Sequence, residues 1–133
     1  MLDERIYESY IGILKEEMVP AMGCTEPIAL AYGAARAREV LGKEPEHITA
    51  KCSGNIIKNV RCVIIPNSDG LTGIEAGVVL GAVAGNASLN MEVLSNVNEF
   101  ERKRCRELLD KKICNVELLD SPVVLHFIIE MQA

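Results

Sequence analysis

Apolar positions in the first part of the chain recur at the spacing of an α-helix. They fall four residues apart, which predicts an amphipathic helix over residues 3–18 that ends before Pro20. The positions are Leu2, Ile6, Tyr10, Leu14 and Met18. A second helix is predicted over residues 26–41, where alanine and glycine keep nearly every side slim, and Gly42 is its predicted C-terminal cap. Such a helix allows close backbone approach, so we expect it deep in the fold.

The middle of the chain changes to a strand-like pattern. Apolar and polar residues alternate over residues 48–52, and β-branched residues dominate residues 60–65, so both segments are predicted strands. A turn over residues 66–70 leads to a buried, glycine-rich helix over residues 71–85.

The last third returns to polar periodicity and then ends in strands. Residues 88–94 are predicted as a short helical turn, and Asn98 with Glu101 has capping-box spacing for a helix that runs to Lys111. Phe100, Cys105, Leu108 and Leu109 are its predicted apolar side. Two strands are predicted over residues 114–119 and 123–131.

The predicted fold class is therefore α+β, in the order α-α-β-β-α-α-β-β. We expect a single domain over residues 1–133 with a largely antiparallel sheet covered by helices. The two small-residue helices are expected to pack together. The final strand is expected to be exposed and to pair with a missing segment or another copy, as in an N-terminal fragment of a longer lyase-like protein.

Composition and charge narrow the classes of function. Apolar residues make up 49%, charged residues 25%, and the net charge is −5. An acidic chain with few aromatics argues against a nucleic-acid partner. The charged start is unlike a signal peptide, and no apolar run reaches the ~18 residues of a membrane span. We therefore expect a cytoplasmic protein with no membrane partner.

Candidate chemistry centres on Cys24 in the segment Met22-Gly23-Cys24-Thr25-Glu26-Pro27. A thiol at a helix start is favoured as a thiolate, which can attack electrophiles or bind metal. The alternative is a small buried apolar side chain. The chain has five cysteines but no Cys-x-x-Cys pair, so it supplies at most part of a metal site.

A second candidate is the polar segment that follows the first predicted strand. Asn55, Lys58 and Asn59 stand among apolar residues just after Gly54, and such groups could bind a small anionic substrate. The alternative is a hydrophilic hairpin tip or bulge. His126 could be a base or a ligand, or a structural residue on a strand.

Several segments, in order, resemble a known family. The Gly-Cys-Thr-Glu-Pro and Ser-Gly-Asn-x-x-Lys-Asn blocks are the specific ones. The matching segments are residues 22–31, 53–60, 65–68, 80–85 and 92–94. Together they resemble the N-terminal part of the L-cysteine desulfidase family, which is related to the iron–sulfur serine dehydratases.

The resemblance implies an iron–sulfur lyase that breaks L-cysteine down to pyruvate, ammonia and sulfide by α,β-elimination. It implies a [4Fe–4S] cluster in the full-length protein, with Cys24 as one of three ligands and the other two in the missing C-terminal part. The cluster is then expected to be absent from this chain, and this fragment alone to be inactive. The other four cysteines do not match ligand positions.

The expected site residues follow from that resemblance and from residue type. Asn55, Lys58 and Asn59 are expected to bind a small amino-acid substrate, and Thr25 and Glu26 to orient the thiolate or the substrate. Lys58 is a candidate base, although a base on the missing half is equally open. The expected partners are a C-terminal domain or companion subunit and a further copy in a homo-oligomer. The alternatives are an L-serine dehydratase and a non-catalytic module that binds a small molecule or mediates oligomerisation.

Overall fold

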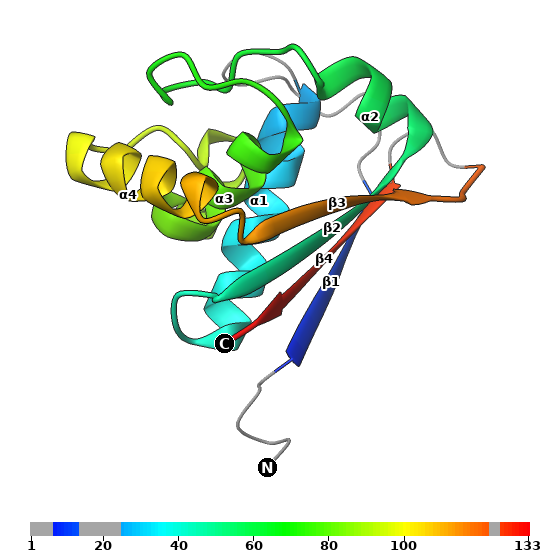
Figure 1. The fold of residues 1–133 in the computed structure, drawn as a ribbon, viewed down its shortest axis with the longest axis horizontal. Helices are drawn as coiled ribbons and strands as arrows, with labels where there is room; N and C mark the ends of the chain where they lie inside the picture. The colour runs from blue at the N-terminus through cyan, green and yellow to red at the C-terminus, as the bar shows by residue number, and fades with distance from the viewer. Residues whose placement is uncertain (1–6, 14–24, 123–125) are drawn as a thin grey trace.

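The structure is a computed structural model and describes residues 7–13, 25–122 and 126–133 (Figure 1). Its strands are β1 (Tyr7–Ile13), β2 (His47–Ser53), β3 (Cys114–Leu119) and β4 (His126–Gln132). Its helices are α1 (Thr25–Leu41), α2 (Gly54–Val60), α3 (Ile74–Ala84) and α4 (Glu99–Asp110), with a 3-10 helix η2 (Ala87–Glu92). The described residues therefore form an α+β fold, as predicted, but with a different order of elements.

The strands form one mixed sheet in the order β1-β4-β2-β3. β4 pairs antiparallel with both β1 and β2, whereas β2 and β3 run parallel. The predicted antiparallel sheet is thus confirmed only in part. The prediction of an exposed final strand is wrong, because β4 lies inside the sheet and the edge strands are β1 and β3.

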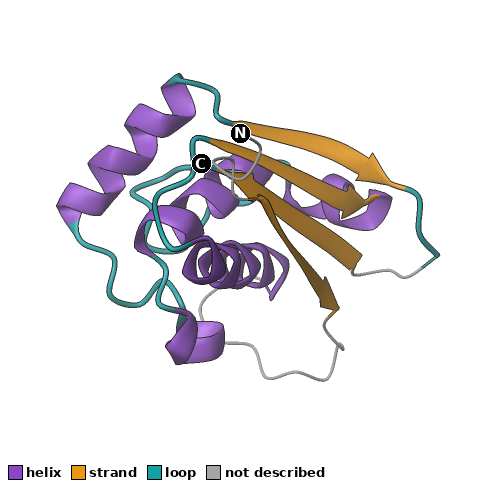
Figure 2. Ribbon diagram, turned by 90° about the horizontal axis from the view of Figure 1, so that it is seen from below, coloured by secondary structure: helices purple, strands orange, loops and turns teal. Residues whose placement is uncertain are grey.

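One face of the sheet packs against the helices and carries the core. In Figure 2 the strands form one layer and the helices lie beside it. Alternate residues of β2 and β4 are buried there: Ile48, Ala50, Cys52, Phe127, Ile129 and Met131. The residues between them are partly or largely exposed on the other face, except for buried Ser53, so the period-two alternation expected from the sequence is confirmed in both strands.

The two slim helices pack together, as predicted. A Cβ built on Gly81 of α3 would lie 2.6 Å from the Ala31 Cα of α1, so the backbones meet at a distance that only glycine allows. A Cβ on Gly33 of α1 would lie 2.5 Å from the Phe127 ring, so α1 also lies directly on β4. Small residues therefore bring α1 between α3 and the sheet, where it is deeply buried.

The predicted helix over residues 3–18 is wrong in its described part. Residues 7–13 form β1, which pairs with β4 from Tyr7↔Gln132 to Ile13↔His126. Tyrosine and isoleucine are good strand formers and Gly12 disfavours helix, so pairing overrides the four-residue spacing. The rest of that prediction lies outside the described residues.

The prediction for residues 53–65 is also wrong. Residues 54–60 form α2, with Ile56 and Val60 buried one turn apart. No strand forms over residues 60–65 in this described segment, where only an isolated bridge joins Ile64 to Thr72. The β-branched residues of this segment do not act together. Val60 is the last residue of α2, and within residues 61–65 only Ile65 is buried.

Most of the remaining predictions are confirmed. The turn over residues 66–70, the buried helix α3 and the 3-10 helix η2 lie where the pattern places them. Asn98 and Glu101 form the predicted capping box of α4. Phe100 is the exception, because it is 78% exposed and does not belong to the apolar side of the helix.

Candidate functional site

The first turn of α1 carries one half of the candidate site. The helix begins at Thr25, whose side chain is not among those described, and continues with Glu26 and Pro27. Proline in the first turn leaves no N–H without a partner, and an acidic side chain there is stabilised by the helix dipole. Glu26 is half-buried, so its carboxylate remains in reach of solvent.

The other half is the exposed face of α2. Asn55, Lys58 and Asn59 stand at positions i, i+3 and i+4 of this helix, which places them on one face. All three are exposed, whereas Ile56 and Val60 anchor the opposite face in the core. A helix thus groups the polar residues more closely than the predicted hairpin tip would.

A hydrogen bond joins the two halves. The Asn59 Nδ2 group donates to the Glu26 Oε2 atom at 3.5 Å, a long contact at the limit for hydrogen bonds. It links residues 33 positions apart in the sequence. The structure therefore brings together two of the predicted site residues that the sequence keeps apart.

Asn55 and Lys58 have no hydrogen-bond or ion-pair partner among the described residues. Their amide and ammonium groups remain available for a ligand. The binding role of both and the catalytic role of Lys58 stay predictions. An exposed ammonium is a compact positive charge with three donors, which suits the binding of an anionic group.

Cys24, the predicted metal ligand, lies outside the described residues. Its role as a ligand therefore stays a prediction. Its position in the sequence is directly before Thr25, where α1 begins.

Three of the four described cysteines are poor thiolates. Burial raises the pKa values of Cys52, Cys105 and Cys114 to about 12, and at Cys52 and Cys114 the nearby Glu75 carboxylate adds a smaller part of that rise. Cys62 is exposed. Because the thiolate is the ligand and nucleophile, these buried thiols act as small apolar residues.

The described residues alone contain no complete ligand set for a metal ion, and the expected ligand Cys24 is not among them. No group of three histidine, cysteine, aspartate or glutamate side chains within residues 7–13, 25–122 and 126–133 could hold a metal ion. Burial keeps Cys52, Cys105 and Cys114 protonated, and a protonated thiol does not bind metal.

His126 and the basic residues of α4 have structural partners. The His126 Nδ1 atom, at the start of β4, lies 2.8 Å from the Ser121 Oγ atom. On α4, Arg104 pairs with Glu44 and Glu107, and Arg106 pairs with Asp69 and Glu99. The ion pairs of Arg104 and Arg106 make this side of α4 an ion-paired solvent face rather than a binding patch.

Two cavities beside β3 were not predicted from the sequence. A cavity of about 150 Å³ is lined by Ile57, Arg61, Gly73, Ile74, Glu75 and Val116. A second, of about 580 Å³, is lined by His47, Glu75, Leu109, Lys112, Cys114 and Asn115. Glu75 lines both, so the cavities are neighbours. The sequence does contain a signal for one wall of the smaller cavity. Ile56 and Val60 are four residues apart, which is helical spacing, and the helix that they anchor also carries Ile57.

Comparison with known proteins gives relatives but no function. No family model matches the chain, and no solved structure matches it. The chain is similar to UPF0597 proteins. It is 48% identical over 128 residues to one from Desulfitobacterium hafniense, covering 96% of this chain and 30% of that protein.

Two further UPF0597 relatives show the same partial coverage. The one from Treponema denticola is 47% identical over 125 residues, covering 94% of this chain and 29% of the relative. The one from Finegoldia magna is 50% identical over 111 residues, covering 84% of this chain and 27% of that relative. The chain spans less than a third of the length of these relatives.

These names correct the family assignment made from the sequence. The relatives are called UPF0597 proteins, not L-cysteine desulfidases or serine dehydratases. The assignment to the L-cysteine desulfidase family is therefore wrong, and the lyase and iron–sulfur descriptions that came with it find no support in the names. As to the membrane, none of the helices described is long and apolar enough to span one.

Proposed function

We propose that the first turn of α1 and the exposed face of α2 form one wall of a binding site for a small α-amino acid in a longer protein. The observation that carries the proposal is the hydrogen bond from Asn59 to Glu26. It places a carboxylate, an ammonium and amide groups on two adjoining helices. That set of groups complements a molecule with one negative and one positive end.

The chemistry of each side chain fits one end of an amino acid. The Lys58 ammonium and the Asn55 amide can donate to a carboxylate, and hydrogen bonds to a charged group are stronger than neutral ones. The Glu26 carboxylate can accept from the ammonium group of the ligand. Asn59 holds Glu26 through its Nδ2 group, so its own role is to position that carboxylate.

The proposed wall faces solvent in this chain, and the chain matches only part of the length of its relatives. Binding sites usually enclose most of a small ligand, whereas Asn55, Lys58 and Asn59 are exposed. More than two thirds of the length of the relatives lies outside the matched part, so further walls can come from there.

Elimination of sulfide from L-cysteine, or of water from L-serine, stays a prediction from the sequence. Neither the described geometry nor the names of the relatives tests it. In such a reaction the residues of this wall would hold the substrate by its two charged ends. The proposal made here concerns that binding step alone.

Chemical-shift mapping by NMR tests the proposal directly. L-Serine added to the 133-residue chain is expected to shift the signals of Glu26, Asn55, Lys58 and Asn59 and to saturate. Propionate and ethanolamine each carry one of the two charges, so each is expected to bind at least about tenfold more weakly. Equal affinity for propionate would show a simple carboxylate site instead.

Matched variants separate the site from general charge effects. Lys58→Ala and Glu26→Gln are expected to weaken L-serine binding about tenfold or more each. Lys103→Ala removes an exposed cation from α4 and is expected to change nothing. The proposal is wrong if L-serine shifts no residue of α1 or α2, both in this chain and in a longer polypeptide that contains it.

A further inference from the structure

We infer that the free edge of β3, with the two cavities beside it, receives an extended segment of the longer polypeptide. That segment would add a fifth strand to the sheet. It lies outside residues 1–133 and differs from the amino-acid wall in position and in partner. The inference is independent of the proposed function, since it concerns the opposite side of α2.

The first observation is the direction of the β3 backbone. The Ile48 N–H donates to the Ile113 carbonyl at 2.8 Å, and in a parallel ladder alternate residues turn toward the neighbouring strand. Asn115 and Glu117 therefore turn their backbone groups toward β2. Val116 and Leu118 turn theirs outward, where no described strand pairs with them.

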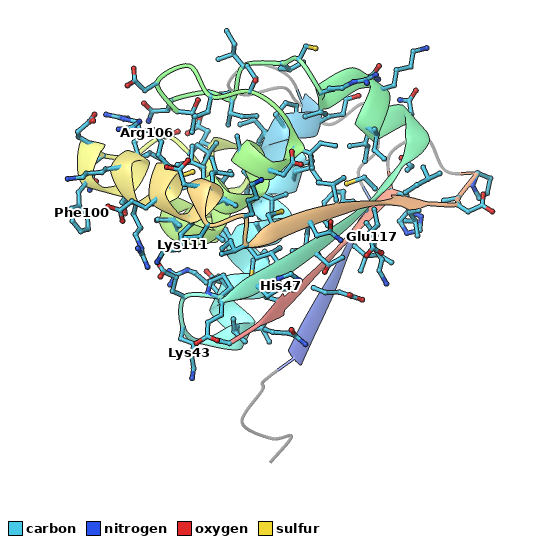
Figure 3. All side chains as sticks on the ribbon, in the orientation of Figure 1. Lys43, His47, Phe100, Arg106, Lys111 and Glu117 are labelled. Atoms are coloured by element: carbon cyan, nitrogen blue, oxygen red, sulfur yellow. The ribbon has the colours of Figure 1, made fainter. Side chains whose placement is uncertain are left out.

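The second observation is that this edge lacks the usual protection. Edge strands that stay unpaired commonly carry proline, a bulge or several charges. β3 has the sequence CNVELL, with one charge and no proline. Its charge, Glu117, projects from the open face of the sheet beside Asn115, so it does not shield the helix-facing side (Figure 3).

The third observation is an apolar surface beside the edge. Val116 lines the smaller cavity with Ile57 and Ile74. Leu118 is 70% exposed on the same side of the strand. An added strand that places apolar side chains at alternate positions would cover Val116 and Leu118 together.

The negative charge of Glu75 indicates which residues the added segment should carry. Glu75 lines both cavities, is exposed, and has no hydrogen-bond or ion-pair partner within the part of the chain that the structure describes. A lysine or arginine of the added segment would pair with it. A second copy of this chain suits the edge less well, because each copy has a net charge of −5 and brings its own Glu117.

The relatives are long enough to contain a segment that could pair with β3. The matched part is 30% or less of each of the three relatives compared, so most of the longer protein must pack against something. A strand edge six residues long with an apolar border is a surface on which it can do so.

Amide hydrogen exchange tests the inference within one strand. A longer polypeptide that contains residues 1–133 is compared with the 133-residue chain alone. The amides of Val116 and Leu118 are expected to exchange about 100-fold more slowly in the longer polypeptide. The amides of Asn115 and Glu117 already bond to β2, so they are expected to be equally slow in both.

Two variants of the longer polypeptide complete the test. Leu118→Lys is expected to restore fast exchange at Val116. Phe100→Lys is the control, because Phe100 is also a highly exposed apolar residue but lies at the far end of α4, and it is expected to leave exchange at Val116 slow (Figure 3). Slow exchange at Asn115 and Glu117 shows that each variant keeps its sheet.

Two results would overturn the inference. One is equal exchange of the outward amides in both proteins. The other is protection of those amides in the 133-residue chain alone, rising with concentration together with a doubled mass in solution. That second result would assign the edge to another copy of the chain.

Discussion

Gly81 of α3 lies against the backbone of Ala31 in α1, so closely that a Cβ at position 81 would be 2.6 Å from the Ala31 Cα. Atoms of the backbone cannot move aside as the end of a side chain can. The absence of a side chain at position 81 therefore sets how closely α1 and α3 approach at this crossing, and Gly85 repeats the device beside Ala35. This contact makes the small-residue pattern of both helices a packing requirement.

Gly81→Ala is expected to destabilise the protein by about 3 kcal/mol or more, because the added methyl group must push two buried helices apart. Urea unfolding followed by circular dichroism measures the loss. Gly54→Ala is the matched control, since a Cβ there would meet only the Leu118 side chain, at 3.8 Å. The control is expected to change stability by less than about 1 kcal/mol. Equal stability of the two variants would contradict the close packing.

Asn67 is expected to contribute through both its side chain and its backbone. Its Nδ2 group donates to the Leu94 carbonyl at 2.9 Å, its Oδ1 atom accepts from Arg102, and its φ is +60°. Asn67→Ala is expected to cost about 2 kcal/mol, and Asn67→Gly about 1 kcal/mol less than that, because glycine adopts positive φ freely. Thermal unfolding of both variants measures the difference. An alanine variant as stable as the glycine variant would show that φ is not a factor.

The ion pair between Arg104 and Glu44 is expected to make stability depend on pH. Hydrogen bonds from Arg104 lower the pKa of the Glu44 carboxyl, against a smaller opposing effect of partial burial. A lowered pKa means that the stabilisation is complete above the unfolded value of about 4.3 and is lost as pH falls through the folded value. Arg104→Gln should therefore narrow the stability difference between pH 6 and pH 3.

An NMR titration of the Glu44 side chain checks the cause. The pKa of Glu44 is expected to rise in Arg104→Gln. Arg36→Gln removes an exposed arginine that pairs with Glu39, and it should leave the titration of Glu44 as it is. A Glu44 titration that is the same in all three proteins would exclude Arg104 as the cause.

The described cysteines are expected to react in an order set by burial. At pH 8 a thiol with a pKa of about 12 is a thiolate in only about one molecule in ten thousand. Iodoacetamide should therefore modify Cys62 long before Cys52, Cys105 or Cys114 in the native protein. Peptide mapping by mass spectrometry gives the order, and the same reaction in urea is the control. Rapid native modification of Cys105 would contradict its burial.

Local signals in the sequence predict much of the helical layer. The small residues of α1 and α3, the capping box of Asn98 and Glu101, and Gly42 as a C-terminal cap act within a few residues. Gly42 has a φ of +85° and its N–H donates to the Arg38 carbonyl, as a cap should. Predictions from such local signals are reliable because the interacting residues are neighbours in the chain.

The sheet could not be predicted as well, because its pairings are distant. Residues 7–13 become a strand only through β4, more than 110 positions away. The mistaken strand over residues 60–65 also suggested a hairpin after β2. With α2 in its place, the chain passes through three α-helices before β3, which is how parallel neighbours are joined.

The candidate site was predicted by residue type but not by geometry. Asparagine and lysine after Gly54 indicated polar chemistry, yet only the helical phase of α2 shows that Asn55, Lys58 and Asn59 share a face. The contact between Asn59 and Glu26 depends on how α1 and α2 sit on the core. The cavities beside β3 likewise arise from three elements that no local pattern connects.

The central position of β4 has a consequence for synthesis on the ribosome. Of the described strands, β1 is made before the others and pairs with β4, so Ile13 must wait for His126 before their ladder can form. At typical translation rates this delay is on the order of 10 s, far longer than hairpin formation. During that interval β1 is an unpaired strand on a nascent chain. Chaperones that hold extended apolar segments would therefore have their longest opportunity at β1, the strand that waits longest for its partner among the strands described.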